Sequence, residues 1–434
     1  MKRNRVKPEI TPIAYGRGTI PLQLDPDLAQ WHVIRPRFAP ALPDAEGVFR
    51  AACREPIASK PLREVIGLSD RVVIVTSDGT RPVPNRKLIP WLLEELPVPA
   101  EQVTVLLGNG SHRANTPAEI SAMFGEDVTR RVKIVNHNAF DPQASVYIGK
   151  GPTGKAAYLN KLYVEADKRI VVGFIEPHFF AGFSGGAKGI IPAIASIDTV
   201  IRIHGFDLIA DPMSTWGTVE ENPIRHELEG LVQHCPPHWM ANVTLNSAKE
   251  ITGVFVGDYI AAHRQGCRRS KEEAMQAVPH LFPLVITSNS GYPLDQNLYQ
   301  TIKGISAAAR ITQPGGTVLI ASECSDGLPD HGNFGALMRA GHSPDDILQN
   351  ILDLPEEILD QWEAQVYAYA MQKYDLQLYC ALDPAMVQAC KLQPVPDFQA
   401  AVEAAIGKLG QRPPVAVLPD GPLTIPYVQS LSAA

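Results

Sequence analysis

Short apolar runs followed by polar turns recur along the chain. The first run, VVIVTS at residues 72–77, begins with four β-branched apolar residues, which is typical of a strand buried on both faces of a sheet. The turn DGTRP at 78–82 follows, and its proline disfavours helix at the residue before it. A helix is then expected at 85–95, where apolar residues return at helical spacing.

This pattern of strand, turn and helix continues to about residue 275 and then restarts. It predicts an α/β fold with mainly parallel sheets. We expect an N-terminal α/β domain at 1–278 and a smaller C-terminal α/β domain at 279–434, because two prolines interrupt the segment 277–283. Further strands are expected at 102–108, 132–136, 169–175, 284–288, 316–322 and 377–382, and further helices at 118–124, 196–204, 297–310 and 355–372.

Polar clusters follow most of these strands. In open parallel sheets, ligands bind beyond the carboxyl ends of the strands. Two domains that present such edges to each other would enclose a cleft. The sequence therefore predicts an active site in the cleft between the domains.

Composition narrows the class of protein. The 434 residues are 45% hydrophobic and 20% charged, with a net charge of −7 and charges of both signs interspersed, so no nucleic-acid partner is expected. Apolar runs do not exceed the length of a strand, and no apolar stretch follows the basic start, so we expect neither a membrane span nor a secretory signal, and a cytoplasmic location. None of the six cysteines forms a CxxC pair, so a zinc site or disulfide framework is not expected.

The glycine-rich run FSGGAKG at 183–189 follows a strand and precedes a helix. Glycines such as Gly185 and Gly186, next to Ser184, let backbone N–H groups approach a phosphate. The run matches neither a Walker A motif nor GxGxxG. Lys188 is open to several interpretations: a phosphate contact, a Schiff-base lysine, another covalent anchor or a plain surface lysine.

Three histidines follow the strands or end the helix near this loop. His204, at a helix C-terminus, suits either a cap on the helix dipole or, as a neutral imidazole, a metal ligand. No HExxH-type set accompanies it, so one histidine plus ligands supplied by a cofactor fits better than a metal held by protein alone. His112 and His178 are candidates for the two bases that a racemase needs, one for each enantiomer, although spacing alone does not show this.

Candidate substrate-binding residues occur in both predicted domains. Arg81 suits a bidentate clamp on a carboxylate, and Asp78 suits a partner that orients it or a nearby histidine; a turn-stabilising ion pair is the plain alternative. Gln300 and Lys303 would share one face of a helix and, with Tyr299, offer hydrogen bonds and a positive charge, unless that face is merely solvated.

Taken together, these motifs resemble the nickel-dependent lactate racemase family, which includes other 2-hydroxyacid racemases and epimerases. The resemblance spans about residues 12 to 420. It is carried by the segments SDGTRP (77–82), GNGSHR (108–113), EPHFFAGFSGGAK (176–188), the downstream histidine 204, YQTIK (299–303) and ECSDG (323–327).

The resemblance implies a nickel-pincer nucleotide attached covalently to Lys188, with Ser184, Gly185, Gly186 and Asp78 around it and His204 as the nickel ligand. It implies that His112 and His178 are the acid/base pair, and that Arg81, Tyr299, Gln300, Lys303 and, by a looser match, Trp362 bind substrate. It also implies hydride transfer from the α-carbon of a 2-hydroxy acid to the cofactor and back, and transient contact with proteins that make the cofactor.

Other interpretations stay open. A non-catalytic homologue that senses a hydroxy acid or nucleotide is one alternative, and a nicotinamide-dependent dehydrogenase, which lacks its fingerprint here, is another. Phe179 and Phe180 are expected to wall the pocket. The acid itself stays open, with lactate, malate, aryl or aliphatic 2-hydroxy acids and sugar acids all compatible.

Overall fold

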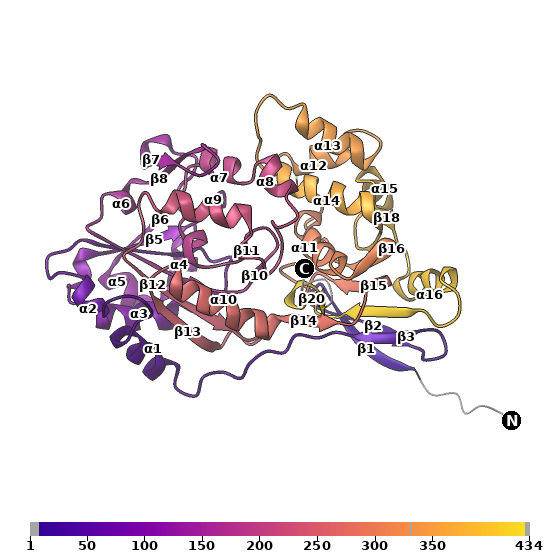
Figure 1. The fold of residues 1–434 in the computed structure, drawn as a ribbon, viewed down its shortest axis with the longest axis horizontal. Helices are drawn as coiled ribbons and strands as arrows, with labels where there is room; N and C mark the ends of the chain where they lie inside the picture. The colour runs from indigo at the N-terminus through magenta and orange to yellow at the C-terminus, as the bar shows by residue number, and fades with distance from the viewer. Residues whose placement is uncertain (1–7, 330–331, 430–434) are drawn as a thin grey trace. The chain divides into compact units, whose positions relative to one another are not determined.

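The computed structural model describes residues 8–329 and 332–429, which form two compact units. Unit 2 comprises residues 38–273, and unit 1 comprises the described residues up to Arg37 together with those from Ala274 onwards (Figure 1). Each unit contains one six-stranded sheet. The expected α/β class with mainly parallel sheets is confirmed.

Unit 2 is built on a sheet in the order β13-β12-β9-β4-β5-β6. All neighbours are parallel except β13, which runs antiparallel to β12 at one edge. The strands are β4 (Val72–Ser77), β5 (Val103–Gly108), β6 (Lys133–Asn136), β9 (Lys168–Phe174), β12 (Trp239–Leu245) and β13 (Ile251–Gly257). From β4 the chain adds β5 and β6 on one side and then β9, β12 and β13 on the other side. The strand order therefore reverses between β4 and β9, and sheets of this kind bind ligands at that point, beyond the carboxyl ends of the strands.

The helices of unit 2 connect these strands. They are α1 (Ala45–Arg54), α2 (Leu62–Val65), α3 (Asn85–Glu95), α4 (Pro117–Phe124), α5 (Glu126–Arg131), α6 (Lys161–Val164), α7 (Ile197–Ile203), α8 (Phe206–Ala210), α9 (Pro223–Val232) and α10 (Ala261–Ala274). Two small hairpins, β7 (Ser145–Lys150) with β8 (Ala156–Asn160) and β10 (Pro177–His178) with β11 (Gly182–Phe183), complete the unit with the 3-10 turns Ala100–Gln102, Pro142–Ala144 and Gly186–Gly189.

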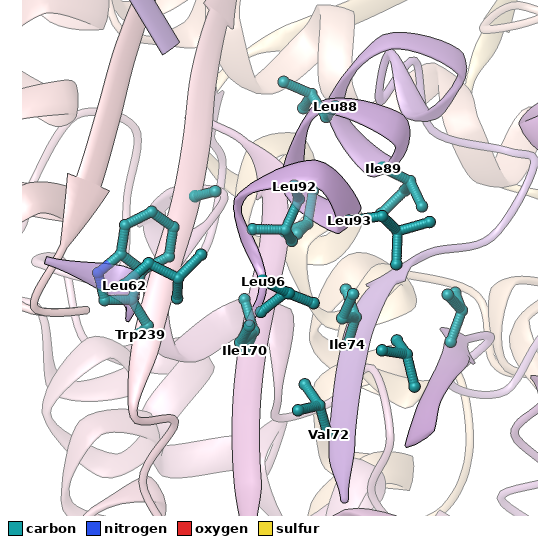
Figure 2. Close-up of a cluster of buried hydrophobic side chains, with 14 of the residues drawn as sticks. Leu62, Val72, Ile74, Leu88, Ile89, Leu92, Leu93, Leu96, Ile170 and Trp239 are labelled. Carbon is teal, nitrogen blue, oxygen red and sulfur yellow. The ribbon is translucent and has the colours of Figure 1, made fainter. Parts of the chain in front are cut away.

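Helix α3 shows how the repeated apolar pattern builds the core of unit 2. Leu88 and Leu92 are fully buried, and they lie on the sheet side of the helix over Ile74 of β4 and Ile170 of β9 (Figure 2). Burying side chains of this size contributes about 1.5–3 kcal/mol each, so this face fixes the helix to the sheet. The turn that precedes α3, which carries Asp78, is thereby held at the end of β4.

Unit 1 is built on a fully parallel sheet in the order β18-β17-β16-β15-β19-β3. Its strands are β3 (Gln30–Val33), β15 (Phe282–Ser288), β16 (Thr312–Ala321), β17 (Asp375–Tyr379), β18 (Gln393–Pro394) and β19 (Pro414–Leu418). Its helices are α11 (Leu298–Ala309), α12 (Phe334–Arg339), α13 (Pro344–Leu352), α14 (Gln361–Lys373), α15 (Pro384–Ala389) and α16 (Phe398–Lys408), and the 3-10 turn Gly421–Leu423 follows β19. Strand β14 (Met275–Val278) pairs with β20 (Ile425–Val428), and β1 (Glu9–Tyr15) pairs with β2 (Gly18–Leu24).

The N-terminal residues depart from the expected domain 1–278, because the described part of the chain up to Arg37 folds with unit 1. Ile13 and Leu22 of the β1–β2 hairpin are fully buried in the core of the unit 1 sheet, and β3 pairs with β19 as its edge strand. The second boundary, at Ala274, lies close to the expected one.

The expected helix at 355–372 begins later, at Gln361, because Asp360 has a φ of 69°, which no right-handed helix accommodates. No helix in the described ranges combines the length and the apolar character needed to span a membrane.

Candidate active site

His112 and Asp78 form a hydrogen-bonded pair beyond the ends of β5 and β4. His112 Nδ1 lies 2.8 Å from Asp78 Oδ2; the aspartate side chain is 4% exposed and the histidine side chain 47%. Asp78 Oδ1 accepts a second hydrogen bond from the Thr80 hydroxyl at 2.7 Å. An ionised Asp78 accepts a hydrogen bond from the N–H of Nδ1, so Nε2 of His112 carries the lone pair that is available for proton transfer.

The electrostatics of Asp78 support this assignment. Burial alone would raise the pKa of Asp78, but the hydrogen bonds with His112 and Thr80 and the charges of His112 and Arg81 outweigh burial and lower it. Arg81 lies on the same turn, where its backbone N–H bonds to the Asp78 carbonyl and its side chain is exposed. Arg81 and Asp78 on the turn after β4 and His112 on the turn after β5 therefore lie beyond the carboxyl ends of neighbouring parallel strands.

The loop after β9 requires its glycines. Gly185 and Gly186 have φ values of 74° and 58°, in the left-handed region that favours glycine. A Cβ on Gly185 would lie 2.5 Å from Asn242 Oδ1, and a Cβ on Gly186 would lie 2.8 Å from the His263 ring. Asn242 Oδ1 also accepts a hydrogen bond from Gly186 N at 2.9 Å. The two glycines thus let the loop lie directly on buried polar side chains.

Side chains of α9 and α10 hold the carbonyl groups of this loop. Arg225 is fully buried and donates to Ala181 O from Nε at 3.2 Å and from Nη2 at 2.9 Å, and also to Phe183 O. His263 Nε2 donates to Ser184 O at 2.8 Å. The Ser184 hydroxyl donates to a carbonyl at the end of β9 and accepts a backbone N–H from Glu176, so its hydrogen bonds close the loop.

His204 is the C-cap of α7 and lies within electrostatic range of Lys188. Its Nδ1 donates to Val200 O at 2.7 Å. Burial, with a smaller effect of the Lys188 charge and against the opposing effect of the Val200 bond, lowers the pKa of His204 to about 4. The ring is therefore neutral at pH 7, with its proton on Nδ1 and its lone pair on Nε2.

His178 has the opposite tautomer to His112. Its Nδ1 accepts the backbone N–H groups of Phe180 and Ala181 at 3.2 and 3.3 Å, so the proton of the neutral ring lies on Nε2. The Phe180 ring centroid lies 6.1 Å from that of His178 and 6.0 Å from that of His204. Phe179 packs on Phe180 and on Trp216, so the two expected wall residues belong to an aromatic cluster beside both histidines.

In unit 1, the structure brings together the four residues expected to bind substrate there. Trp362 Nε1 of α14 donates to the Tyr299 hydroxyl of α11 at 3.2 Å, and Tyr299 donates to Asp360 Oδ1 at 3.2 Å. Lys303 Nζ donates to Gln300 Oε1 at 2.6 Å. The result is one cluster of hydrogen-bonding groups and an ammonium between two neighbouring helices.

Both halves of the chain match models of known domains. The lactate racemase N-terminal domain matches residues 15–217, and the lactate racemase C-terminal domain matches residues 280–425. This chain belongs to the lactate racemase family. It is accordingly an isomerase of the racemase type.

Two curated relatives in this family carry the name lactate racemase. The protein from Thermoanaerobacterium thermosaccharolyticum is 36% identical over 382 residues, covering 87% of this chain and 89% of the relative. The protein from Lactiplantibacillus plantarum is 35% identical over 372 residues, covering 84% of this chain and 87% of the relative.

Solved structures agree in fold with this family member. The lactate racemase apoprotein from T. thermosaccharolyticum superposes with a TM-score of 0.88 at 33% identity, covering 96% of this chain and all of that chain. A protein from Thermotoga maritima superposes with a TM-score of 0.64 at 19% identity, covering 89% of this chain and 98% of that chain, and shows a shared fold.

Two buried charged residues that contact the site residues were not identified from the sequence. Arg225 holds the glycine loop, and Glu363 is buried beside Tyr299 and Lys303. A signal exists for both, because each is a charged residue on the apolar side of a helix. Arg225 precedes Leu228 by three residues, and Glu363 precedes Tyr367 by four.

Proposed function

We propose that this racemase inverts C2 of a 2-hydroxy acid by reversible hydride transfer to a nickel-pincer nucleotide attached to Lys188. The observation that carries the proposal is the neutral imidazole of His204, which has its proton on Nδ1 and its lone pair on Nε2. This ring lies within electrostatic range of Lys188, which belongs to the glycine loop. A neutral imidazole is a good nickel ligand. An amine on a tight loop at the end of a strand suits covalent attachment.

The residues present fit such a group. Within the described ranges, no set of three or more His, Cys, Asp or Glu side chains is arranged to hold a metal ion. A nickel ion at His204 would therefore take its other ligands from the nucleotide. When bound, the group supplies a reversible acceptor for hydride from the substrate α-carbon.

Substrate orientation falls to cations and hydrogen-bond donors of the chain. Arg81 and Lys303 each offer a positive charge for a carboxylate, and the planar guanidinium of Arg81 suits bidentate pairing. Gln300, Tyr299 and Trp362 offer hydrogen-bonding groups on the Lys303 side. A small 2-hydroxy acid needs one carboxylate clamp and one contact for its hydroxyl, and these residues supply both.

Proton transfer falls to His112 and His178. Nε2 of His112 accepts the hydroxyl proton of one enantiomer, and ionised Asp78 stabilises the imidazolium that forms. In this direction His178 begins as the imidazolium and gives the proton of Nε2 to the carbonyl oxygen when hydride returns to the opposite face of the planar 2-keto acid, so His178 ends neutral and His112 ends protonated. The opposite enantiomer reacts in reverse with His178 as the base at Nε2, for which its neutral ring carries the proton on Nδ1 in place of the contacts from the Phe180 and Ala181 N–H groups.

We infer lactate as the first acid to test, because the curated relatives are named for it. We further propose that the chain works in the cytoplasm and meets the cofactor-making proteins transiently, when Lys188 is loaded.

The test is production of the chain together with the cofactor-making proteins. We expect a covalent mass increment on Lys188, about one nickel per chain, and conversion of each lactate enantiomer to a mixture on chiral chromatography. Lys188→Ala is the matched control that loses all three. A wild-type chain that remains unmodified under these conditions contradicts the covalent cofactor; a loaded chain that binds lactate without converting it indicates a non-catalytic homologue.

A further inference from the structure

Asn222 is a fully buried side chain that the proposed reaction does not use. It is the N-cap of α9, where its Oδ1 accepts the backbone N–H of Arg225 at 2.9 Å. Its Nδ2 donates to Phe180 O at 2.7 Å. Ser, Thr and Asp also cap helices well, but Asn alone among them carries a separate donor atom beside its accepting oxygen. The choice of Asn therefore indicates a task beyond the cap.

A single peptide group links Asn222 to His178. Phe180 O and the N–H of Ala181 belong to one planar trans peptide, so they point in opposite directions and turn together. The oxygen accepts Asn222 Nδ2, and the N–H donates to Nδ1 of His178 at 3.3 Å. Asn222 thus fixes the direction of one of the two N–H groups that Nδ1 accepts, the other being that of Phe180 at 3.2 Å.

The carbonyl groups that follow Phe180 are also held. Ala181 O and Phe183 O accept the guanidinium of Arg225, and Gly182 O accepts the backbone N–H of Gly217 at 3.0 Å. The peptide that Asn222 holds therefore lies in a segment whose neighbouring peptides are fixed as well. The N–H of Ala181 does not turn away from the imidazole without breaking bonds to buried donors.

These contacts conflict with the reacting forms of His178. A ring nitrogen that accepts two N–H groups is unprotonated, so the ring is neutral with its proton on Nε2. The acid and the base proposed above both carry a proton on Nδ1, which would point at the same two N–H groups. The conflict lies on the Nδ1 side of the ring and holds whatever Nε2 contacts. The ring has to leave these contacts before it transfers a proton.

We propose that Asn222 is a positioning residue that holds His178 in a resting tautomer through the Phe180–Ala181 peptide. The inference rests on the proposed function in one respect, namely that His178 transfers a proton at Nε2. Leaving the resting state requires only water as a co-reactant. Nδ1 takes a proton from water to give the imidazolium, and loss of the Nε2 proton to the substrate oxygen then leaves the base with its proton on Nδ1.

The test is nitrogen NMR of the full chain made without cofactor and labelled with 15N-histidine. Spectra are recorded at pH 8, where a histidine of ordinary pKa is neutral and its two ring nitrogens reveal the tautomer. His178→Gln assigns the signal. We expect the wild-type ring to carry its proton on Nε2. In Asn222→Ser, which keeps a neutral cap and loses the amide, the tautomer ratio should shift about two- to tenfold toward Nδ1, the effect of losing one hydrogen bond.

A matched control is Asn160→Ser. Asn160 is also a buried N-cap, of α6, and its Nδ2 donates to Nδ1 of another histidine, His137, at 2.9 Å. The same substitution there should change the His137 signal and leave that of His178 unchanged. Equal His178 tautomer ratios in wild type and Asn222→Ser would overturn the proposal. A His178 shift of the same size in both variants would also overturn it, because the effect would not come from the Asn222 amide.

A second variant separates the donor from the cap. Asn222→Asp keeps the size of the side chain and an oxygen for the helix cap, and at pH 8 the ionised carboxylate has no N–H to donate to Phe180 O. It should shift the His178 tautomer ratio in the same direction as Asn222→Ser. A wild-type ratio in Asn222→Asp would show that capping alone matters and would overturn the proposal.

The loaded chain gives the sign of the effect on turnover. Because the resting tautomer opposes the reaction, kcat for both lactate enantiomers in Asn222→Ser should equal the wild-type value or exceed it by up to about tenfold, at equal adduct mass on Lys188. A kcat lowered more than about twofold, with the tautomer shifted, would overturn the proposal, because the tautomer with its proton on Nε2 would then be the working form.

The two hypotheses fail in different ways. The NMR measurement uses the unloaded chain, so a loaded wild-type chain that does not racemise lactate would contradict the proposed function and leave the anchoring by Asn222 supported. Racemisation together with an unchanged His178 tautomer in the Asn222 variants would support the function and overturn the role of Asn222.

Discussion

Replacing Asp78 by Asn tests how far the buried carboxylate activates His112. Asn keeps the size of the side chain and removes its charge. The amide can also turn its NH₂ group toward Nδ1 of His112, which would place the histidine proton on Nε2. The substitution therefore removes the partner of the imidazolium and disfavours the tautomer that accepts a proton.

The magnitude follows from the geometry of the pair. The contact of 2.8 Å to a carboxylate that is 4% exposed is a charge-assisted hydrogen bond. Such bonds contribute about 1.5–3 kcal/mol, which corresponds to a loss of about 10- to 150-fold in the step that protonates His112. The lower part of this range is expected, because the histidine side chain is half exposed and water screens the pair.

The assay is kcat/KM for both lactate enantiomers, measured by chiral chromatography on chains with equal adduct mass at Lys188. Thr80→Val removes only the bond to Asp78 Oδ1 and is the matched control, with an expected loss of at most about threefold. A fully loaded Asp78→Asn chain that retains more than a third of wild-type kcat/KM would refute the role of the carboxylate.

Three further changes test the supports of the site and of the fold. Arg225→Met leaves buried carbonyl groups of the glycine loop without a hydrogen-bond donor. We therefore expect the free energy of unfolding to fall by about 2–5 kcal/mol and the cofactor to be attached to Lys188 less completely. A free energy from denaturant unfolding and an intact mass that both equal the wild-type values would contradict this. Leu92→Ala opens a cavity under α3 and should cost about 2–5 kcal/mol in denaturant unfolding with normal loading, whereas a cost under 1 kcal/mol would show that the sheet contact is loose. Burial and the nearby Arg169 and Lys168 charges lower the pKa of His238 to about 4, so the unfolded chain binds its proton below about pH 6.5 and the folded chain does not. Stability from this group is thus present above pH 6.5 and lost as pH falls toward 4. His238→Asn should flatten that loss in pH-dependent unfolding by about 1–2 kcal/mol, less than the whole shift would give because water screens a half-buried ring; an equally steep loss in the variant would exclude His238 as its source.

Most elements of the parallel sheets could be predicted because each depends on a local run of residues. β4 and α3 lie where the apolar pattern predicts them, since a buried strand and an amphipathic helix leave distinct periods in the sequence. The strand β12 does not stand out, because the buried Asn242 and Thr244 interrupt its apolar run. Asn242 is polar for a reason found elsewhere in the chain, since it holds the glycine loop.

The residues of the candidate site also fall into those that the sequence indicates and those that it does not. His112 and Lys188 lie in motifs of neighbouring residues and His204 at the end of a predicted helix, so sequence alone indicates all three as candidates. Arg225 and Glu363 are buried by segments more than 40 residues away in the sequence. A local sequence pattern does not indicate which distant polar group a buried charged side chain will contact. Long-range pairing also explains the domain boundary, since β3 finds its partner β19 at the far end of the chain.

That last pairing has a consequence for biosynthesis. The first strands of unit 1 leave the ribosome long before β19, and at about 5–20 residues per second the interval between them is roughly 20–80 s. During this time the apolar side of the β1–β2 hairpin has no sheet to cover, whereas residues 38–273 are complete and able to fold. Newly made chains therefore pass through a stage at which unit 2 can be folded while the apolar side of the β1–β2 hairpin is still exposed. We expect chaperones to bind this hairpin during that stage.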